Sequence, residues 1–450
     1  MSNFRPINRD TGFLLPPSVD EWLPQRHLAR FVVEVVDRLD LSALEKAYRG
    51  SGSASYHPAM LLSLLIYGYA TKVFSSRALE RATYDSVAVR FIAGNEHPDH
   101  DTIANFRKRF LGQIEPLFVE VLKLARAMGM LKLGTVALDG TKVHANASRH
   151  SALSYGHARK LEKQLKREVR QLLRLAEQAD GVNTPDGMSI PEELERREQR
   201  LAAIAEAKAK IEARVEEREH AEYQAKLAAR AEKTKRTGKK PRGRPPEPPS
   251  GGVADKEQIN LTDEDSRIMP VAGGGFDQCY NAQAVVAAES LLIVAREVVQ
   301  TTNDHPQLAP MLGQLKALPQ GLGRVRRLLA DAGYASEANV ERCAAVQIEP
   351  LIALGRERHH RGWRQRFAPA PKAPPPTATA LERMRHRLKT PEGRRLYALR
   401  KQTPEPVFGS IKSAMGFRQF LLRGLPNVRG EWNLVAMSWN IKRMFALQPV

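Results

Sequence analysis

A short apolar segment that stops at an acid most constrains the fold of this chain. Residues 135–148 read TVALDGTKVHANAS, in which an apolar run leads directly to Asp139 and Gly140. Valine, threonine and small residues favour extended backbone, so we predict a buried strand that delivers one carboxylate at its exposed end. An Asp-Gly pair after an apolar run is also a common turn signal, and the turn is the simpler interpretation of this segment alone.

A second segment with the same pattern favours the strand interpretation over the turn. Residues 328–334 read LLADAGY, so another apolar run ends at an acid, Asp331. Residues 276–300 are rich in Val, Ile and Ala and predict a hairpin of two long strands. A helix at 336–346 and a strand at 348–354 follow, which together predict a mixed sheet flanked by helices, an α/β fold. Ligands in such sheets gather at strand ends.

Composition and charge indicate the class of partner. The chain has 450 residues, 42% of them hydrophobic, with a formal charge of +20 and a pI near 10.0. Its length predicts two or three structural units. Residues 233–245 hold seven Lys/Arg and no acid, and residues 356–400 hold thirteen Lys/Arg against three Glu. The basic surplus therefore lies mainly in two segments, and it favours a polyanionic partner.

Cysteine content and hydropathy indicate the compartment. Cys279 and Cys343 are too few for a disulfide framework or a structural zinc site, which fits a reducing cytosol. The longest apolar run, residues 60–70, is shorter than the roughly 20 residues of a membrane span. The N-terminus lacks the apolar core of a signal peptide. We therefore expect a soluble, intracellular protein without membrane contact.

The N-terminal region is predicted to be helical and offers a basic cluster. Apolar residues recur at helical spacing in residues 31–48, and residues 60–69 read as a buried helix. Ser75 or Ser76, and Asp101, are candidate caps of two further helices. The last of these is expected to end at three cations, Arg107, Lys108 and Arg109. Phosphate contact and a helix-dipole preference for cations explain this cluster equally well.

Residues 157–232 differ in composition and form an insertion between the two acidic strands. Leucine and isoleucine at heptad spacing predict an antiparallel helical hairpin, with Ser189 in a capping box at the start of the second arm. Dimerisation, DNA contact and a solvated coil without a specific role all remain open for it.

A basic linker, residues 233–252, follows the hairpin. Its Pro and Gly content excludes a helix or strand interior. The core Pro-Arg-Gly-Arg-Pro, with Arg242 and Arg244, resembles an AT-hook that lies in the minor groove of DNA. General attraction to phosphate is the simpler interpretation.

A third acid completes a candidate site. Glu405 follows Thr403 and Pro404, which predict a helix start, and Lys412 lies almost two turns further on the same face, about 10 Å away. An acid in the first turn of a helix is also stabilised by the helix dipole, so Glu405 alone does not indicate a metal site. Asp139, Asp331 and Glu405 together supply hard oxygen ligands of the kind that Mg²⁺ or Mn²⁺ prefers. Two such ions catalyse in-line phosphoryl displacement.

These segments together resemble the DDE transposases of bacterial insertion sequences. The matching motifs are LDGTKVHANAS, GGFDQCYNAQAVV, LLADAGY, YALRKQTPEPVFGSIKSAMGFRQFLLRG and, in the helical region, DHDTIANFRKRF. The resemblance implies an RNase H-like catalytic core with Asp139, Asp331 and Glu405 as metal ligands. It further implies that Tyr397, Arg400 and Lys412 contact DNA ends. The spacing from Arg400 to Glu405 is one residue longer than the usual pattern, so Lys401 is an alternative to Arg400.

The resemblance predicts an organisation and an activity. The expected domains are a helical DNA-binding domain (1–130), a catalytic domain (131–156 and 253–450), the helical hairpin (157–232) and the basic linker (233–252). The expected enzyme binds Mg²⁺ or Mn²⁺, cuts double-stranded DNA at its element's ends and joins them to target DNA, as a homodimer in the cytoplasm on the nucleoid. The alternatives are a hydrolytic nuclease with the same site and an inactive DNA-binding protein.

Overall fold

The chain folds into two compact units. A computed structural model describes residues 18–48, 55–179, 190–238, 243–249, 251–271, 273–355 and 372–448. The first unit comprises residues 1–146 with 279–450, and the second comprises residues 147–278. In this division the N-terminal helices and the sheet belong to the same unit.

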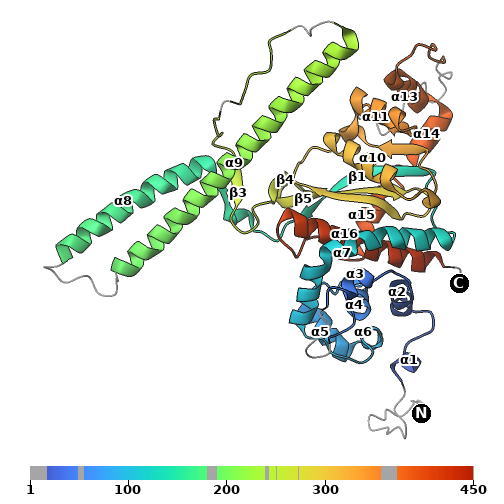
Figure 1. Cartoon of the computed structure of the whole chain (residues 1–450), viewed down its shortest axis with the longest axis horizontal. Coiled ribbons are helices and arrows are strands. Elements are labelled where there is room, and N and C mark those ends of the chain that lie inside the picture. Colours follow the sequence, from blue (N-terminus) through green and yellow to red (C-terminus); the bar gives the residue numbers. More distant parts are fainter. Residues whose placement is uncertain are drawn as a thin grey trace, which may run out of the picture. The chain divides into compact units, whose positions relative to one another are not determined.

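A mixed sheet is the centre of the first unit (Figure 1). Its six strands in the described residues are β1 (Thr135–His144), β4 (Arg267–Pro270), β5 (Phe276–Ala287), β6 (Ile293–Val299), β7 (Arg327–Ala330) and β8 (Glu349–Ile352). They follow the order β4-β5-β1-β7-β8, and β6 also pairs with β5, so the path β6-β5-β1-β7-β8 runs through the same sheet. The pairs β6–β5 and β5–β1 are antiparallel, whereas β1–β7 and β7–β8 are parallel. The α/β class expected from the sequence is confirmed.

One C-terminal helix joins this sheet to the N-terminal helices. Helix α16 (Leu425–Leu447) buries residues around most of its circumference, and it packs against β6, α4 (Pro58–Ala70) and α7 (His100–Ala127). Towards the sheet, Trp432 Nε1 donates a hydrogen bond to the Gln283 carbonyl at 3.1 Å. A helix that is apolar on nearly every side must be covered on every side. The N-terminal helices supply the cover that the sheet does not.

The remaining N-terminal helices are short. They are α1 (Val19–Trp22), α2 (Leu28–Val36), α3 (Ser42–Glu45), α5 (Ser76–Asp85) and α6 (Val87–Ile92). Residues 31–48, in which apolar residues recur at helical spacing, belong to two helices, α2 and α3, and the Asp40 carboxylate between them accepts from the Ser42 amide at 3.0 Å. Ser75 caps α5 as expected, but Asp99, rather than Asp101, caps α7.

Further helices surround the sheet. Figure 1 shows α10 (Leu308–Ala317) and α11 (Glu337–Ala345) on the side of the sheet away from α16. Helices α13 (Ala380–Lys389) and α14 (Pro391–Ala398) pack leucines and Tyr397 over β1, β7 and β8, and α15 (Pro404–Ser413) follows. Single turns of 3₁₀ helix lie at His305–Gln307, Gln320–Leu322 and Ala332–Tyr334.

The second unit consists of two long helices on a small two-stranded sheet. Helices α8 (Tyr155–Ala179) and α9 (Ile190–Thr237) pack together, and β2 (Ala152–Ser154) pairs with β3 (Gln258–Asn260). A short strand, β4 (Arg267–Pro270), follows. The core of the unit comprises Leu153, Ala158, Leu165, Ile204, Ala207, Ile211, Val215 and Ile259. The predicted capping residue Ser189 lies outside the described residues.

Two features bear on the compartment. Both cysteines, Cys279 and Cys343, are buried and free. In the described ranges, no helix has both the length and the apolar character needed to cross a bilayer.

Candidate active site

Two neighbouring strands bring Asp139 and Asp331 together. The last residues paired between the parallel strands β1 and β7 are Leu138 and Ala330. Asp139 and Asp331 are therefore the next residues on two strands whose backbones lie roughly 4.8 Å apart. The expectation that Asp139 ends its strand is wrong, because β1 continues to His144 by pairing with β5. Asp139 lies at an edge because its neighbour β7 stops, while Asp331 does follow the end of its strand.

Asp139 has the most perturbed carboxylate of the site. Burial raises its pKa from the ordinary value to about 6, and the negative charges of Asp331 and Asp304 act in the same direction. The Arg400 guanidinium and a hydrogen bond from the Gly140 amide at 2.9 Å oppose that rise. A buried carboxylate near two other acids favours a cation beside it.

Arg400 connects the second acid to the third. Its guanidinium lies 2.9 Å from Glu405 Oε1 and 3.9 Å from Asp331 Oδ2. The Arg400 side chain is only 13% exposed, whereas the neighbouring Lys401 is exposed. Glu405 lies in the first turn of α15, and this helix packs against β1. The three predicted acids therefore lie around one guanidinium.

The chemistry of these acids suits a metal ion, but their positions in this structure do not yet form a complete metal site. Carboxylate oxygens are the donors that Mg²⁺ and Mn²⁺ prefer, and the raised pKa of Asp139 indicates a position where a cation is favoured. Among the described residues, however, no three acidic, imidazole or thiol groups are close enough to hold one ion. Arg400 already occupies the space between Asp331 and Glu405 as their counterion.

A fourth acid, Asp304, also belongs to this group. From the sequence, either Asn303 or Asp304 is expected to cap a helix that starts near Pro306. The Asp304 carboxylate caps no helix, because the turn that follows receives no side-chain hydrogen bond from it. Instead, Asp304 Oδ1 accepts from Asn281 Nδ2 at 2.7 Å and Gln283 Nε2 at 2.8 Å. Lys142 Nζ lies 3.7 Å from the same oxygen. Asp304 thus lies beside Asp139 and is held by three donors.

The sequence contained a signal for this acid. Asn281 and Gln283 are two polar residues in the otherwise apolar stretch YNAQAVV, and both are fully buried in β5. Residues two apart lie on the same face of a strand, and buried amides need partners. Such a pair predicts a buried acceptor nearby, although it does not identify Asp304.

Gly140 makes room for this arrangement. A Cβ at Gly140 would lie 2.2 Å from Gln283 Nε2 and 2.9 Å from Asp304 Oδ1. No side chain fits there, so the Asp-Gly pair of β1 is explained by close packing beside the acids.

Lys412 and Tyr397 lie nearby with partly structural roles. Lys412 Nζ donates to the Lys142 carbonyl at 2.7 Å, and burial lowers the pKa of Lys412. Tyr397 packs with leucines of α13 and α14 against Ala137, Leu329 and Leu351.

The predicted basic cluster of the N-terminal region needs correction. Helix α7 does not end there but continues to Ala127, so the three cations lie within the helix. The buried Arg107 donates to Tyr69 Oη at 3.3 Å and to the Phe74 carbonyl at 3.1 Å, which makes it unsuited to phosphate. Lys108 and Arg109 are exposed, and Arg109 lies over the Tyr48 ring.

The basic linker is described only in part. Arg242 lies outside the described residues. The Arg244 side chain is exposed and forms an ion pair with Glu247 at 2.7 Å. The carbonyls of Gly243 and Arg244 accept from the Arg230 guanidinium of α9, so this part of the linker turns back onto the helix.

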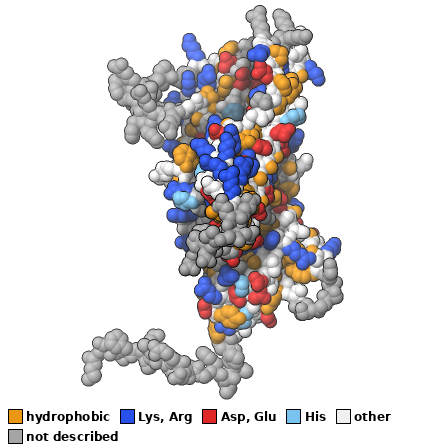
Figure 2. Space-filling view, turned by 90° about the vertical axis from the view of Figure 1, so that its left-hand side faces the viewer, with side chains coloured by type: hydrophobic (Ala, Val, Ile, Leu, Met, Phe, Trp, Pro, Cys, Tyr) orange, Lys and Arg blue, Asp and Glu red, His pale blue; other side chains and the backbone are white. Residues whose placement is uncertain are grey.

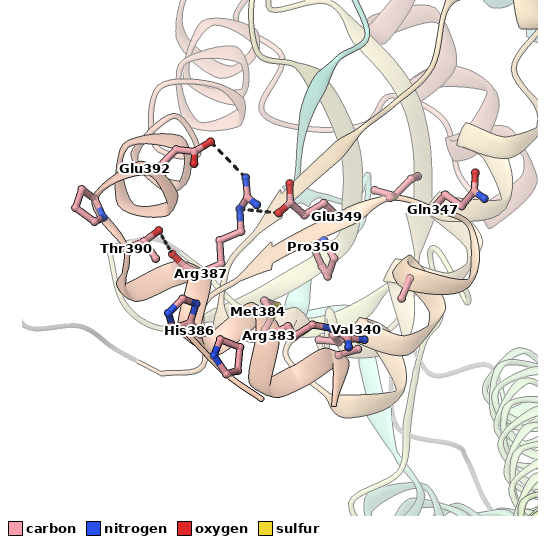
Figure 3. A pocket seen from close by; sticks show the side chains of 15 residues that line it. Val340, Gln347, Glu349, Pro350, Arg383, Met384, His386, Arg387, Thr390 and Glu392 are labelled. Atoms are coloured by element: carbon pink, nitrogen blue, oxygen red, sulfur yellow. Dashed lines mark hydrogen bonds and ion pairs between the residues drawn. The ribbon is translucent and has the colours of Figure 1, made fainter. Parts of the chain in front are cut away.

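A cavity of about 810 Å³ lies away from the acids (Figure 3). Its wall includes Glu349, whose carboxylate pairs with Arg387 at 2.6 Å. Glu349 is the first residue of β8, whereas Asp331 follows the last residue of the parallel neighbour β7. The cavity therefore opens at the opposite edge of the sheet.

Comparisons with known families match both ends of the chain. Residues 17–109 match a transposase domain family (DUF772), and residues 372–445 match a transposase DDE domain. Both matches are to transposase domains, and together they support a DDE-type transposase of an insertion element. No curated protein and no solved structure matches it.

The match to the DDE domain indicates an enzyme of DNA phosphoryl transfer. The DDE family implies metal-dependent cleavage and strand transfer, and both matches support a transposase function. The matched DDE segment contains Arg400, Glu405 and Lys412, but Asp139 and Asp331 lie outside both matched regions. Assigning those two aspartates depends on the geometry of the sheet.

Proposed function

We propose that Asp139, Asp331 and Glu405 are the catalytic acids with which this transposase cuts its element's ends and joins them to target DNA. The observation that carries this assignment is the position of Asp139 and Asp331 at equivalent places on adjacent strands, with Arg400 connecting Asp331 to Glu405. The strand order β6-β5-β1-β7-β8, with three antiparallel and two further parallel strands, supports an RNase H-like core.

These acids would hold Mg²⁺ or Mn²⁺. A bound divalent ion activates a water or a 3′ hydroxyl and stabilises the leaving oxygen. The chain's own contribution is to gather the carboxylates: β1 and β7 place two of them, and α15 presents the third. Arg400 neutralises Asp331 and Glu405 in this structure, and it would have to release at least one of them for that carboxylate to hold an ion. Arg400, rather than Lys401, is then the functional basic residue, because only Arg400 is directed into the site.

The DNA substrate requires basic surfaces around the acids. We propose that Lys142, Lys412 and Tyr397 line the path of the element end. Lys142 lies 3.7 Å from Asp304, Lys412 donates to the Lys142 carbonyl, and Tyr397 packs against Ala137 and Leu329, each two residues before a site acid. The helical region 1–130 is the proposed DNA-binding domain, with Lys108 and Arg109 as its exposed cations. Arg242 and Arg244 add attraction to phosphate. Simultaneous action on two ends favours a homodimer on the nucleoid.

The test compares isosteric variants on duplexes that carry the element ends. Asp139→Asn, Asp331→Asn and Glu405→Gln each remove one charge at nearly constant volume, so we expect cleavage to fall at least 1,000-fold (~4 kcal/mol) while end binding persists. Excess chelator should abolish wild-type cleavage in the same way.

The control is Glu289→Gln, which removes an exposed acid at the turn between β5 and β6. It should cleave at the wild-type rate. Wild-type cleavage by Asp139→Asn would remove Asp139 from the site. Cleaved ends without any joined product would favour the hydrolytic nuclease over the transposase.

A further inference from the structure

One face of helix α8 in the second unit packs against helix α9. Ala158, Leu161 and Leu165 lie on that face and pack into the core shared with α9. The acids Glu162 and Glu168 lie near the same face, where they pair with Lys208 at 2.8 Å and Arg197 at 3.0 Å. The negative charge of the described part of α8 is thus directed toward α9.

Between Lys160 and Arg174, the opposite face of α8 carries only cations and amides. Its cations are spaced three and four residues apart, which places them in a single row along a helix. They are Lys160, Lys163, Arg167, Arg170 and Arg174, and all five are exposed. We call this row the α8 basic stripe. At 1.5 Å per residue it extends about 21 Å, close to the rise of six base pairs of B-DNA.

The α8 basic stripe is not neutralised within the described part of the chain. None of its five cations forms an ion pair there, although Lys166 of the same helix pairs with Glu162 at 2.6 Å. Several exposed cations of α9 do have acids beside them: Arg196 with Glu193 at 3.1 Å, Lys210 with Glu206 at 2.6 Å and Lys226 with Glu222 at 3.9 Å.

This difference indicates a polyanion as the partner. Like charges three and four residues apart destabilise a helix by about 0.2–0.5 kcal/mol per pair, so an external anion would stabilise the row. The centre of a protein interface is depleted of charge and rich in aromatic residues, whereas this face between Lys160 and Arg174 offers only Lys, Arg and Gln. Figure 2 shows Lys and Arg side chains gathered on one face of the molecule.

We propose that the α8 basic stripe binds the phosphate backbone of duplex DNA, independently of its sequence. Lys and Arg side chains then donate to phosphate oxygens and release condensed counterions. This assigns a DNA-binding surface to the helical insertion. It does not depend on the catalytic proposal, because phosphate contacts form without divalent metal.

Salt-dependent binding of the full chain tests the proposal. The probe is a fluorescent 30-base-pair duplex of arbitrary sequence, measured by anisotropy over a range of KCl concentrations in EDTA. Each phosphate contact adds about 0.9 to the slope of log K against log salt. The triple variant Lys163→Gln, Arg167→Gln and Arg170→Gln should lower that slope by about 2–3 and weaken binding at least tenfold near physiological salt.

A charge-matched control isolates the stripe. The control is a triple variant of α9 that also removes three cations: Arg196→Gln, Lys210→Gln and Lys226→Gln. In the wild-type protein each of these three cations pairs with a carboxylate. Glutamine retains helix propensity, so circular dichroism should show folded protein in both variants. Equal slopes for the stripe and control variants would overturn the proposal, as would a change of oligomeric state in the stripe variant without any loss of slope. Asp139→Asn should keep the wild-type slope, which separates this proposal from the catalytic one.

Discussion

At the scale of single residues, Asp304 is the clearest addition to the site. It lies beside Asp139 and Asp331 and is held by amides from β5 and by Lys142. Asp304→Asn keeps an oxygen that can accept from both amides but removes the charge. Residues that support metal ligands typically contribute 10–100-fold to affinity or activity.

We therefore expect Asp304→Asn to cleave 10–100-fold more slowly at limiting Mn²⁺, with the deficit shrinking as Mn²⁺ is raised. Thermal unfolding without metal should remain at or above the wild-type midpoint, because one repulsive charge is gone. Unchanged Mn²⁺ dependence would show that Asp304 does not act on the site.

Gly140 allows a second residue-scale prediction. A methyl group there would lie 2.2 Å from Gln283 Nε2, so Gly140→Ala must displace the amides that hold Asp304. Overpacking of this kind costs about 1–3 kcal/mol, measurable by denaturant unfolding. Gly134→Ala, where nothing lies within 4 Å of the new carbon, is the matched control and should be nearly neutral.

At the scale of elements, α16 depends on one buried acid. Glu431 accepts from Tyr69 Oη at 2.7 Å and from the amides of Leu421 and Leu422 at 3.0 Å. Burial raises the pKa of Glu431 above its ordinary value, so its ionised form is disfavoured in the folded state. Its stabilising contribution is complete below the unfolded-state pKa and declines as pH rises through the folded-state pKa.

Glu431→Gln should therefore destabilise the protein, because the new amide group faces donors; the cost of such a mismatch is about 1–3 kcal/mol. That deficit relative to wild type should be largest at acid pH and shrink as pH rises. Urea unfolding at several pH values measures it, and a deficit that grows with pH would contradict the raised pKa.

Elements with strong local signals were predictable, whereas those shaped by packing were not. The apolar runs before Asp139 and Asp331 do form strands, and Thr403-Pro404 does begin a helix. The length of α7 was missed, because its continuation beyond Arg109 depends on burial against α16 rather than on local pattern. Asp304 was missed for a similar reason, since only the folded loop after β6 brings it to Asp139.

At the scale of the whole molecule, the second unit is inserted at one point of the sheet. It begins after Asn146 and ends at Gln278, and the nearby residues His144 and Cys279 are register partners of β1 and β5. Paired residues on antiparallel strands lie about 5 Å apart. The ends of the insertion are therefore close enough to join directly.

Replacing residues 147–278 with a short Gly-Ser linker should leave the first unit folded. We expect a cooperative thermal transition, because β1, β6, β7, β8 and their helical cover remain, although β4 with the buried Met269 and the first residues of β5 are removed. A molten, non-cooperative product would show that the insertion is needed for folding.

The junction at His144 and Cys279 also determines which strands transmit a force from the inserted unit to the sheet. The two strands that leave the sheet toward the insertion are those that carry Asp139 and the amides holding Asp304. If the inserted helices bind DNA as proposed, tension on them reaches the sheet through β1 and β5, the strands that lead to these carboxylates.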